Sequence, residues 1–115
     1  MDRTEVARKA LNEIVRRVGK YLEGIHKSEI ETSVITDSEH DQFGLRRHGW
    51  RANERERVSN TVFFARIKDG KVWIEEDNTD LCLADELVKA GIAREDIVLA
   101  FQPPEVRHLT EFAVA

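Results

Sequence analysis

A helical periodicity opens the chain. Between residues 6 and 22 the apolar side chains recur at spacings of three and four, which places them on one stripe of an α-helix. Asp2 can accept the free N–H groups of the first turn, and Glu5 occupies the capping-box position. Gly24 is a typical helix stop. The sequence therefore predicts an N-terminal helix whose apolar stripe must be covered by the rest of the chain.

The period changes to two near residue 29. Alternating apolar and polar side chains predict a strand over residues 30–37. Residues 43–51 are a second strand candidate, although Gly44 and Gly49 weaken it. Asn53 to Arg57 is typical of a charged turn. This part of the chain therefore favours an antiparallel meander.

Two β-rich runs flank Asp69-Gly70 within residues 58–76, and this dipeptide suits a two-residue type I′ turn. The turn fixes the register of the hairpin. The pairs expected on the core face are Ile67 with Val72 and Ala65 with Ile74, with Phe63 beside them. The pair expected on the opposite face is Arg66 with Trp73, next to Phe64 and Val62.

A second helix is predicted after the hairpin, capped by Thr79 or Asp80 and ended by Gly91. Residues 97–101 are an apolar run consistent with a buried strand, and Pro103-Pro104 ends it. The predicted fold is α+β: one domain of residues 1–115 with an N-terminal helix, an antiparallel sheet of about four strands, and the second helix packed on the same sheet face. The expected core includes Leu11, Ile14, Val18, Phe63, Ile67, Ile74 and Leu87.

Charge and composition narrow the functional classes. The 115 residues are 41% hydrophobic and 35% charged, and the formal net charge is -4. Proteins that hold DNA by neutralising phosphates are usually basic, so this balance weighs against autonomous DNA binding. No apolar run reaches the length of a membrane span, and the N-terminal residues lack a secretory h-region. A cytoplasmic protein is expected.

The residue types needed for catalysis or metal binding do not fall into known patterns. Cys82 is the only cysteine, and its neighbours Leu81 and Leu83 favour core packing. No two of the histidines have the i, i+4 helical spacing of a zinc site; they are His26, His40, His48 and His108. The acidic cluster is predicted to cap a helix and face solvent; it comprises Glu75, Glu76, Asp77 and Asp80. The sequence predicts no enzyme, no cofactor and no metal.

Two surfaces are candidates for binding. The first is the one basic concentration, which contains Trp50 and is diluted by Glu54 and Glu56; its basic residues are Arg46, Arg47, His48, Arg51, Arg55 and Arg57. A β-ribbon with arginines and an aromatic residue can enter a DNA groove. The same charges can instead form a solvated edge that discourages strand-on-strand aggregation.

The second candidate is the non-core side of the hairpin, where Phe64, Arg66 and Trp73 are expected together, with Trp50 as a further member. Arginine over indole is a favourable cation–π pair, and such residues dominate protein–protein hot spots. The alternatives are that a helix or the C-terminal tail covers this side, or that it forms a homodimer.

The second half of the chain resembles the XisI family in an ordered set of motifs. These are Ile67–Ile74 in the hairpin, Asp77–Asp80 after it, then Ala84, Glu86, Leu87, Val88 and Gly91, and finally Glu95–Phe101, Pro103-Pro104 and Thr110–Val114. In two places the chain departs from the family, which commonly has histidine where this sequence has Gln102 and Phe64.

The resemblance implies an accessory factor that controls excision of a DNA element, named for the nitrogen-fixation fdxN element, rather than an enzyme. Such proteins usually occur with an XisH-like factor that resembles an endonuclease fold. The resemblance therefore implies protein–protein binding to an XisH-like partner, with direct DNA binding through Arg46–Arg57 as the alternative.

Overall fold

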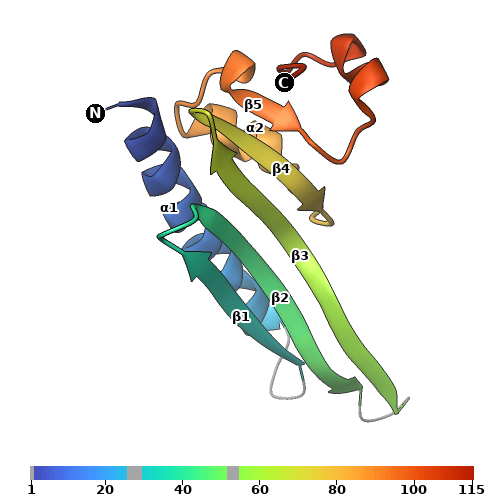
Figure 1. Cartoon of the computed structure of the whole chain (residues 1–115). Coiled ribbons are helices and arrows are strands. Elements are labelled where there is room, and N and C mark those ends of the chain that lie inside the picture. Colours follow the sequence, from blue (N-terminus) through green and yellow to red (C-terminus); the bar gives the residue numbers. More distant parts are fainter. Residues whose placement is uncertain (1, 26–29, 52–54) are drawn as a thin grey trace.

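A twisted sheet with helices on one side is the frame of the molecule (Figure 1). The computed structural model describes residues 2–25, 30–51 and 55–115. Within them the elements are α1 (Arg3–Ile25), β1 (Ile30–Asp37), β2 (Gln42–Arg51), β3 (Glu56–Lys68), β4 (Lys71–Asp77), α2 (Leu83–Lys89), β5 (Ile97–Leu99), and two 3₁₀ turns, η1 (Arg94–Asp96) and η2 (Pro104–Leu109). His26 and residues 53–54 of the predicted charged turn lie outside the described residues, and Glu56 and Arg57 of that turn belong to β3 instead.

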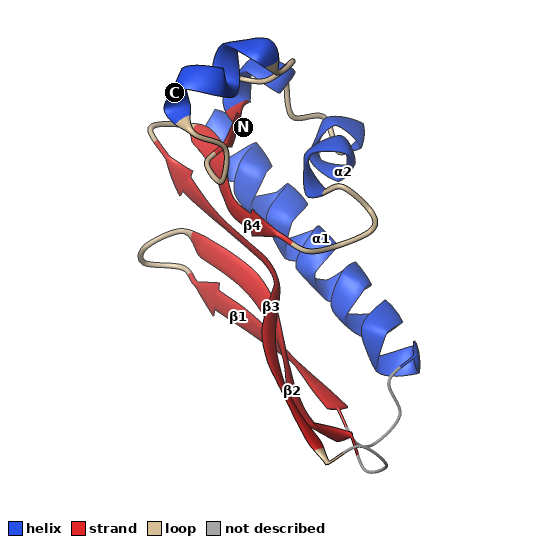
Figure 2. Cartoon of the chain, turned by 90° about the vertical axis from the view of Figure 1, so that its right-hand side faces the viewer, coloured by secondary structure: helices blue, strands red, loops and turns tan. Residues whose placement is uncertain are grey.

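Helix α1 begins as its capping signal predicts, because Asp2 Oδ1 accepts the Glu5 backbone N–H at 2.8 Å. Its apolar stripe packs on the sheet, and α2 lies on the same side (Figure 2). All seven side chains expected in the core are at most 9% exposed, which confirms the predicted layer arrangement. No helix among the described residues is long and apolar enough to cross a membrane.

The Asp69-Gly70 turn sets the register of the β3–β4 hairpin as predicted. Both residues have positive φ, 54° and 75°, which is what a type I′ turn requires. Lys68 and Lys71 are paired across the turn. The pairs Ile67 with Val72, Ala65 with Ile74, and Arg66 with Trp73 are all confirmed.

A register shift between β2 and β3 changes the side of one predicted residue. Leu45 pairs with Phe63 while Arg46 pairs with Thr61, so Val62 is an extra residue on β3. Val62 is consequently 7% exposed and belongs to the core, whereas strict alternation had placed it beside Arg66. A second shift leaves Glu75 as an extra residue on β4, between Ile74 and Glu76.

The sheet has five strands in the order β1-β2-β3-β4-β5, one more than the sequence suggested. The fifth strand is β5, which lies in the apolar run 97–101 that the sequence indicated as a buried strand. It pairs in parallel with β4 through Trp73 with Val98 and its neighbours. A parallel pair needs a crossover connection, and α2 supplies it. The sheet is therefore mostly, but not wholly, antiparallel.

The start of α2 differs from the prediction. The helix begins at Leu83, and its N–H donates at 2.7 Å to Asp77 Oδ2 rather than to Thr79 or Asp80. The acidic cluster does therefore cap a helix, but from β4 across the loop. Cys82 has a φ of 56° at the turn into the helix and is exposed, so the predicted core packing of this thiol is wrong.

Candidate interaction surface on the open sheet face

One sheet face remains open over β1, β2 and β3. Helices α1 and α2 cover the opposite face, and the C-terminal segment approaches the sheet at β5, where Ala113 forms a bridge with Val98 (Figures 1 and 2). We call the face away from α1 and α2 the outer face. Its exposed apolar side chains include Ile35 and Trp50, which are 42% and 57% exposed.

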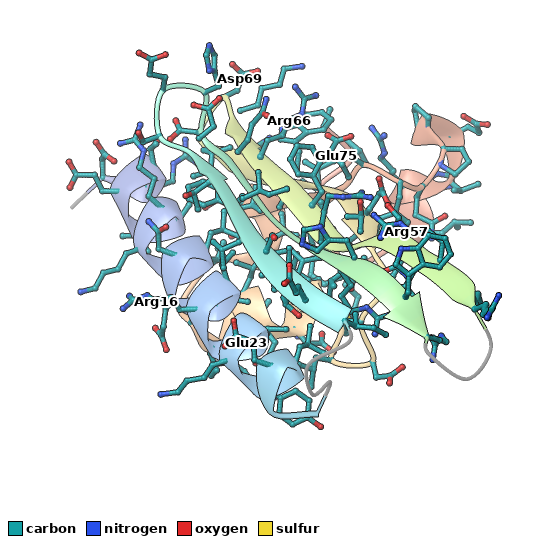
Figure 3. The ribbon with its side chains drawn as sticks, turned by 90° about the horizontal axis from the view of Figure 1, so that it is seen from below. Arg16, Glu23, Arg57, Arg66, Asp69 and Glu75 are labelled. Atoms are coloured by element: carbon teal, nitrogen blue, oxygen red, sulfur yellow. The ribbon has the colours of Figure 1, made fainter. Side chains whose placement is uncertain are left out.

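The outer-face pair predicted from the hairpin register is partly covered. Arg66 Nε donates to Glu75 Oε2 at 2.9 Å, and Figure 3 shows both side chains across the sheet from α1. The cations over the Trp73 ring are Lys68 at 4.9 Å and Arg107 at 5.7 Å, rather than Arg66 as expected. Trp73 is therefore beneath the C-terminal segment, which is the alternative that the sequence left open, while Arg66 remains accessible.

Arg107 links parts of the C-terminal segment to one another through its guanidinium group. The donors Nε, Nη1 and Nη2 reach the carbonyl oxygens of Gln102, Val114 and Ala100 at 3.0, 3.3 and 3.2 Å. Gln102 takes part through its backbone, so this bond does not depend on which side chain stands there. A peptide with such internal bonds is a fixed cover for Trp73.

Phe64 is held by the neighbouring glycine. A Cβ atom built on Gly44 would lie 3.2 Å from Phe64 Cδ1 and 3.0 Å from the Phe63 carbonyl oxygen. The Phe64 ring thus lies over Gly44, a cross-strand arrangement that compensates for a glycine in a strand. The half-buried ring stands beside Arg66 on the outer face.

Trp50 lies apart from this group. It pairs with Arg57, whose guanidinium is 5.6 Å from the centre of its ring, while Arg66 pairs with Gln42. Gln42 and Trp50 are eight positions apart on β2, about 26 Å in an extended strand. The outer face therefore carries two patches: a proximal patch of Phe64, Arg66 and Trp73, and a distal patch of Arg46, His48, Trp50 and Arg57.

The five candidate arginines do not share one surface. Arg46 pairs with Thr61 on the outer face, whereas Arg47 lines a hollow beside Tyr21 of α1 on the other side. Arg51 pairs with Glu56 at the end of the hairpin, and Arg55 has a φ of 49° in the turn. Only Arg46 and Arg57 thus belong to the distal patch.

The structure adds hydroxyl groups that the sequence did not single out. Ser33 Oγ and His48 Nε2 are 2.7 Å apart, and Arg46 donates to Thr61 Oγ1 at 2.6 Å and to Ser59 Oγ at 3.1 Å. The signal in the sequence was the spacing of Arg46, His48 and Trp50 at every second position, which puts them on one strand face. Their hydroxyl neighbours become evident only with the registers of β1 and β3.

Strong local electrostatics lie at the other end of β1. His40 Nδ1 is 2.7 Å from Asp37 Oδ2, and this hydrogen bond holds the pKa of Asp37 below its ordinary value. The guanidinium of Arg8 lowers the pKa of Asp41 in the same way, through bonds of 2.7 and 3.0 Å. Both contacts lie at the surface, and the ion pair of Arg8 with Asp41 joins α1 to the β1–β2 turn. Among the described residues no three His, Cys, Asp or Glu side chains converge as metal ligands do.

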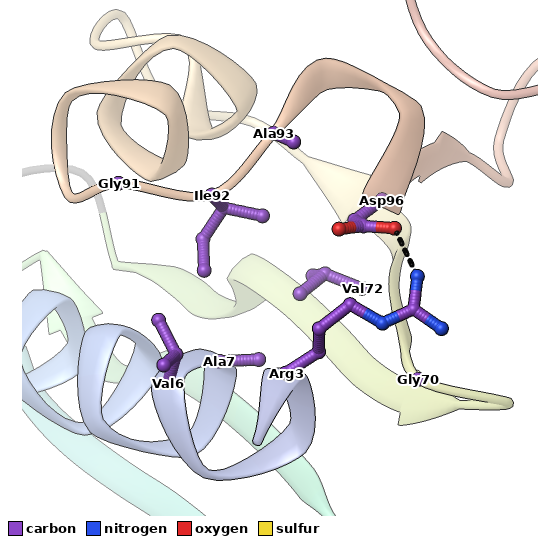
Figure 4. Close-up of a pocket in the computed structure, with 9 residues that line it drawn as sticks. All are labelled: Arg3, Val6, Ala7, Gly70, Val72, Gly91, Ile92, Ala93 and Asp96. Atoms are coloured by element: carbon purple, nitrogen blue, oxygen red, sulfur yellow. Dashed lines mark hydrogen bonds and ion pairs between the residues drawn. The ribbon is translucent and has the colours of Figure 1, made fainter. Parts of the chain in front are cut away.

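The hollows near the helices have little catalytic character. One of about 180 Å³ lies between α1, the Asp69-Gly70 turn and the loop after α2, and its charged groups, Arg3 and Asp96, already pair at 2.9 Å (Figure 4). The hollow at Arg47 measures about 290 Å³. Small-molecule sites usually enclose about 300–1,000 Å³, so the first hollow is small for such a site and the second is at the lower limit.

Comparison with known proteins gives a consistent result along the whole chain. The crystal structure of fdxN element excision controlling factor XisI from Anabaena variabilis ATCC 29413 matches with a TM-score of 0.80 and 35% identity, covering 99% of this chain and 100% of that one. A XisI-like protein from the same organism matches with a TM-score of 0.79 and 32% identity, over 97% and 95% of the two chains. Neither description names a catalytic activity.

A comparison with curated protein sequences gave no significant match. The model of the family described as XisI protein matches residues 1–114. The first half of the chain, where the sequence motifs were weak, is thus included with the second. Since the match to the family model and the structural likeness both extend over nearly the full length, this chain belongs to the XisI protein family.

Proposed function

We propose that the protein is a non-enzymatic accessory factor in the excision of a DNA element and acts by binding an XisH-like protein with an endonuclease fold. The full-length likeness to an excision controlling factor carries this proposal. A factor of this kind needs a recognition surface rather than a reaction centre. The outer face offers one over β1, β2 and β3, because α1 and α2 lie on the opposite face.

The proximal patch is the proposed contact. Arg66 is accessible, with its side chain 39% exposed, and its partner Glu75 lies beside it at 30%. Arginine and aromatic residues contribute most of the binding energy at many protein interfaces. Phe64 is fixed on Gly44, so its ring loses little conformational freedom when a partner covers it.

The net charge of -4 supports the same partner class. An endonuclease-like protein presents a basic surface to DNA, and opposite potentials speed the encounter of two proteins. The ion pair of Arg66 with Glu75 offers both signs of charge at the contact, which favours a defined orientation.

Co-purification tests this proposal. Tagged full-length protein is expected to retain the XisH-like partner, and Arg66→Ala is expected to weaken the affinity about thirtyfold if Arg66 is a hot spot of about 2 kcal/mol. Arg66 is a better choice than Trp73, because loss of the Trp73 ring would also release Arg107 and the C-terminal segment.

The matched control is Arg17→Ala. Arg17 also forms one ion pair, with Glu86 at 2.8 Å, but lies on α1 on the other side of the molecule. It should leave binding unchanged while both variants keep a wild-type circular dichroism spectrum. Equal loss in the two variants would place the contact elsewhere, and a wild-type protein that retains no such partner would refute the proposed function.

Direct DNA binding is the second candidate, and one observation favours it. Arg46 and Arg57 bond to hydroxyl and carbonyl oxygens, so their charges are not neutralised by a carboxylate within the described part of the chain. Binding by such cations should weaken steeply as salt is added. A gel shift with duplex DNA at low salt checks this. No shift at micromolar protein would exclude direct DNA binding and would leave the proposed binding of the XisH-like partner unaffected.

A further inference from the structure

Three strands bring donor side chains together at one level of the outer face. Ser33, Arg46 and Thr61 form one row across β1, β2 and β3, and His48 and Ser59 form part of the next row. The two rows are joined by the 2.7 Å contact of Ser33 with His48 and by the bond of Arg46 to Ser59. The hydroxyl groups hold the Arg46 guanidinium across β3 and orient it.

The charge of Arg46 has neutral partners in the described structure, where several other arginines face a carboxylate. Five others form ion pairs with carboxylates, at distances of 2.7–3.0 Å. Arg46 has two hydroxyl partners, and neither reduces its positive charge. The guanidinium has further N–H donors in its fork, which match the geometry of a phosphate group.

We propose that these two rows bind a phosphate group of a nucleic-acid backbone. Arg46 supplies the positive charge, and Ser33 and His48 supply a hydroxyl and an imidazole beside it. Hydroxyl and guanidinium groups are among the donors that proteins use for phosphate oxygens, and an imidazole ring also has an N–H to donate. The strand partner of His48 is Glu31, whose negative charge opposes an anion at this position and so limits its affinity.

The shape of the surface favours a polymer over a free phosphate ion. The rows lie on an open sheet face, where a small ion stays exposed to water. Trp50 with its partner Arg57 lies four positions further along β2, about 13 Å away. An exposed indole stacks on a base, and a second arginine can meet a neighbouring phosphate. This inference deepens the second candidate function and does not depend on the XisH-like partner.

The first experiment uses inorganic phosphate as the probe. Titration of the ¹⁵N-labelled full-length protein, followed by amide NMR shifts, should perturb residues 33, 46 and 48 in the wild type. Arg46→Gln removes the charge and keeps an amide donor, and it should weaken binding about tenfold. Arg16→Gln removes the same charge from the far side of α1, where Figure 3 shows it, and should have no effect. Equal effects of the two variants, or no shifts in the wild type, would overturn the site.

A second pair of variants tests the site by gain of binding. Glu31→Gln removes the carboxylate opposite His48 and should tighten phosphate binding about threefold, the effect of one screened charge near a surface. Glu23→Gln on α1 is the matched control and should change nothing. If Glu31→Gln does not tighten binding relative to Glu23→Gln, the phosphate does not sit at these rows.

The last arm identifies the source of the phosphate. A fluorescein-labelled oligonucleotide should bind the wild type more tightly than inorganic phosphate does, and quench Trp50. Arg46→Gln should weaken the binding of both phosphate and the oligonucleotide. If phosphate binds and the oligonucleotide binds no better, the nucleic-acid source is refuted. Retention of the XisH-like partner by Arg46→Gln would show that the partner contact of the proposed function is independent of this site.

Discussion

Arg107 is a buried cation with no carboxylate partner in the described structure, and it carries a specific stability role. Its three donor atoms bond to backbone carbonyls, and it covers Trp73. Arg107→Met keeps the apolar stem and leaves these carbonyls without their donors, so we expect a loss of about 2 kcal/mol in the free energy of unfolding. Urea unfolding measures this loss. Faster hydrogen exchange of the Ala113 amide, which bonds to Ile97 at 2.8 Å, would locate it in the C-terminal segment.

Arg94→Met is the control for that substitution. Arg94 also lies over an aromatic ring, that of Phe112, but its side chain is 46% exposed and it pairs with the exposed Glu111. Exposed pairs contribute about 0–1 kcal/mol, so this variant should lose less than Arg107→Met. Equal losses would mean that burial of the guanidinium adds nothing.

Single residues differ in how far their roles could be predicted. Asp2 and Asp69-Gly70 act within a few positions of themselves, and the sequence was sufficient for both. Arg107 acts on Trp73 from 34 positions away, so no local pattern indicated it. The prediction for Cys82 was wrong because its neighbours Leu81 and Leu83 favoured core packing, whereas the helix begins at Leu83 and leaves the thiol exposed.

At the scale of elements, α1 and α2 are joined by an ion pair that gives folding a pH dependence. The pKa of Glu86 is lowered chiefly by the hydrogen bond from Arg17, with a further contribution from Lys89, against the opposing effect of burial. A lowered pKa means that the folded state binds fewer protons than the unfolded chain. The stabilisation is therefore complete above the ordinary glutamate pKa of about 4.3. It is lost as the pH falls below that value and through the lower pKa of Glu86 in the folded state.

Arg17→Gln should accordingly flatten the decline of stability between about pH 5 and pH 3. Urea unfolding of both proteins across this range measures the slope. Arg16→Gln makes the same change of charge one residue away, and it should keep the wild-type slope. If both variants flatten the curve equally, net charge rather than the Arg17–Glu86 pair is responsible.

The elements themselves were mostly predictable, and their exceptions have a physical cause. Helix α1, the meander and the hairpin follow from periodicity and turn chemistry, which are local. The extra residue at Val62 is not local, because it arises where β2 and β3 lose register beyond Leu45. Strand β5 has only three residues, and it pairs in parallel with β4 after the chain has passed through α2. Its sequence could therefore indicate that the strand is buried, but not that β4 is its partner.

At the scale of the whole molecule, the helices pack on one face of the sheet, and the outer face carries two chemically different patches. The proximal patch combines an aromatic ring with an ion pair, and the distal patch combines an aromatic ring with arginines that have neutral partners. The sequence identified most members of both patches. It placed Trp50 in both groups, and the structure places it with the arginines, because the distance between Gln42 and Trp50 depends on the length over which β2 and β3 stay paired.

This separation predicts that the two proposed activities can be removed independently. Arg66→Ala should weaken only the binding of the XisH-like partner, and Arg46→Gln should weaken only the binding of the oligonucleotide. The double variant should show each loss of affinity at the size found in the single variants. Substitutions with no shared contacts and more than about 7–10 Å between them usually add. Arg66 is opposite Gln42, which lies four positions from Arg46 on β2, about 13 Å along an extended strand. Affinities of the four proteins for each ligand, measured at one salt concentration, give the coupling directly. A double variant whose loss for either ligand differs from the single loss by more than about twofold would mean that both ligands contact one continuous surface.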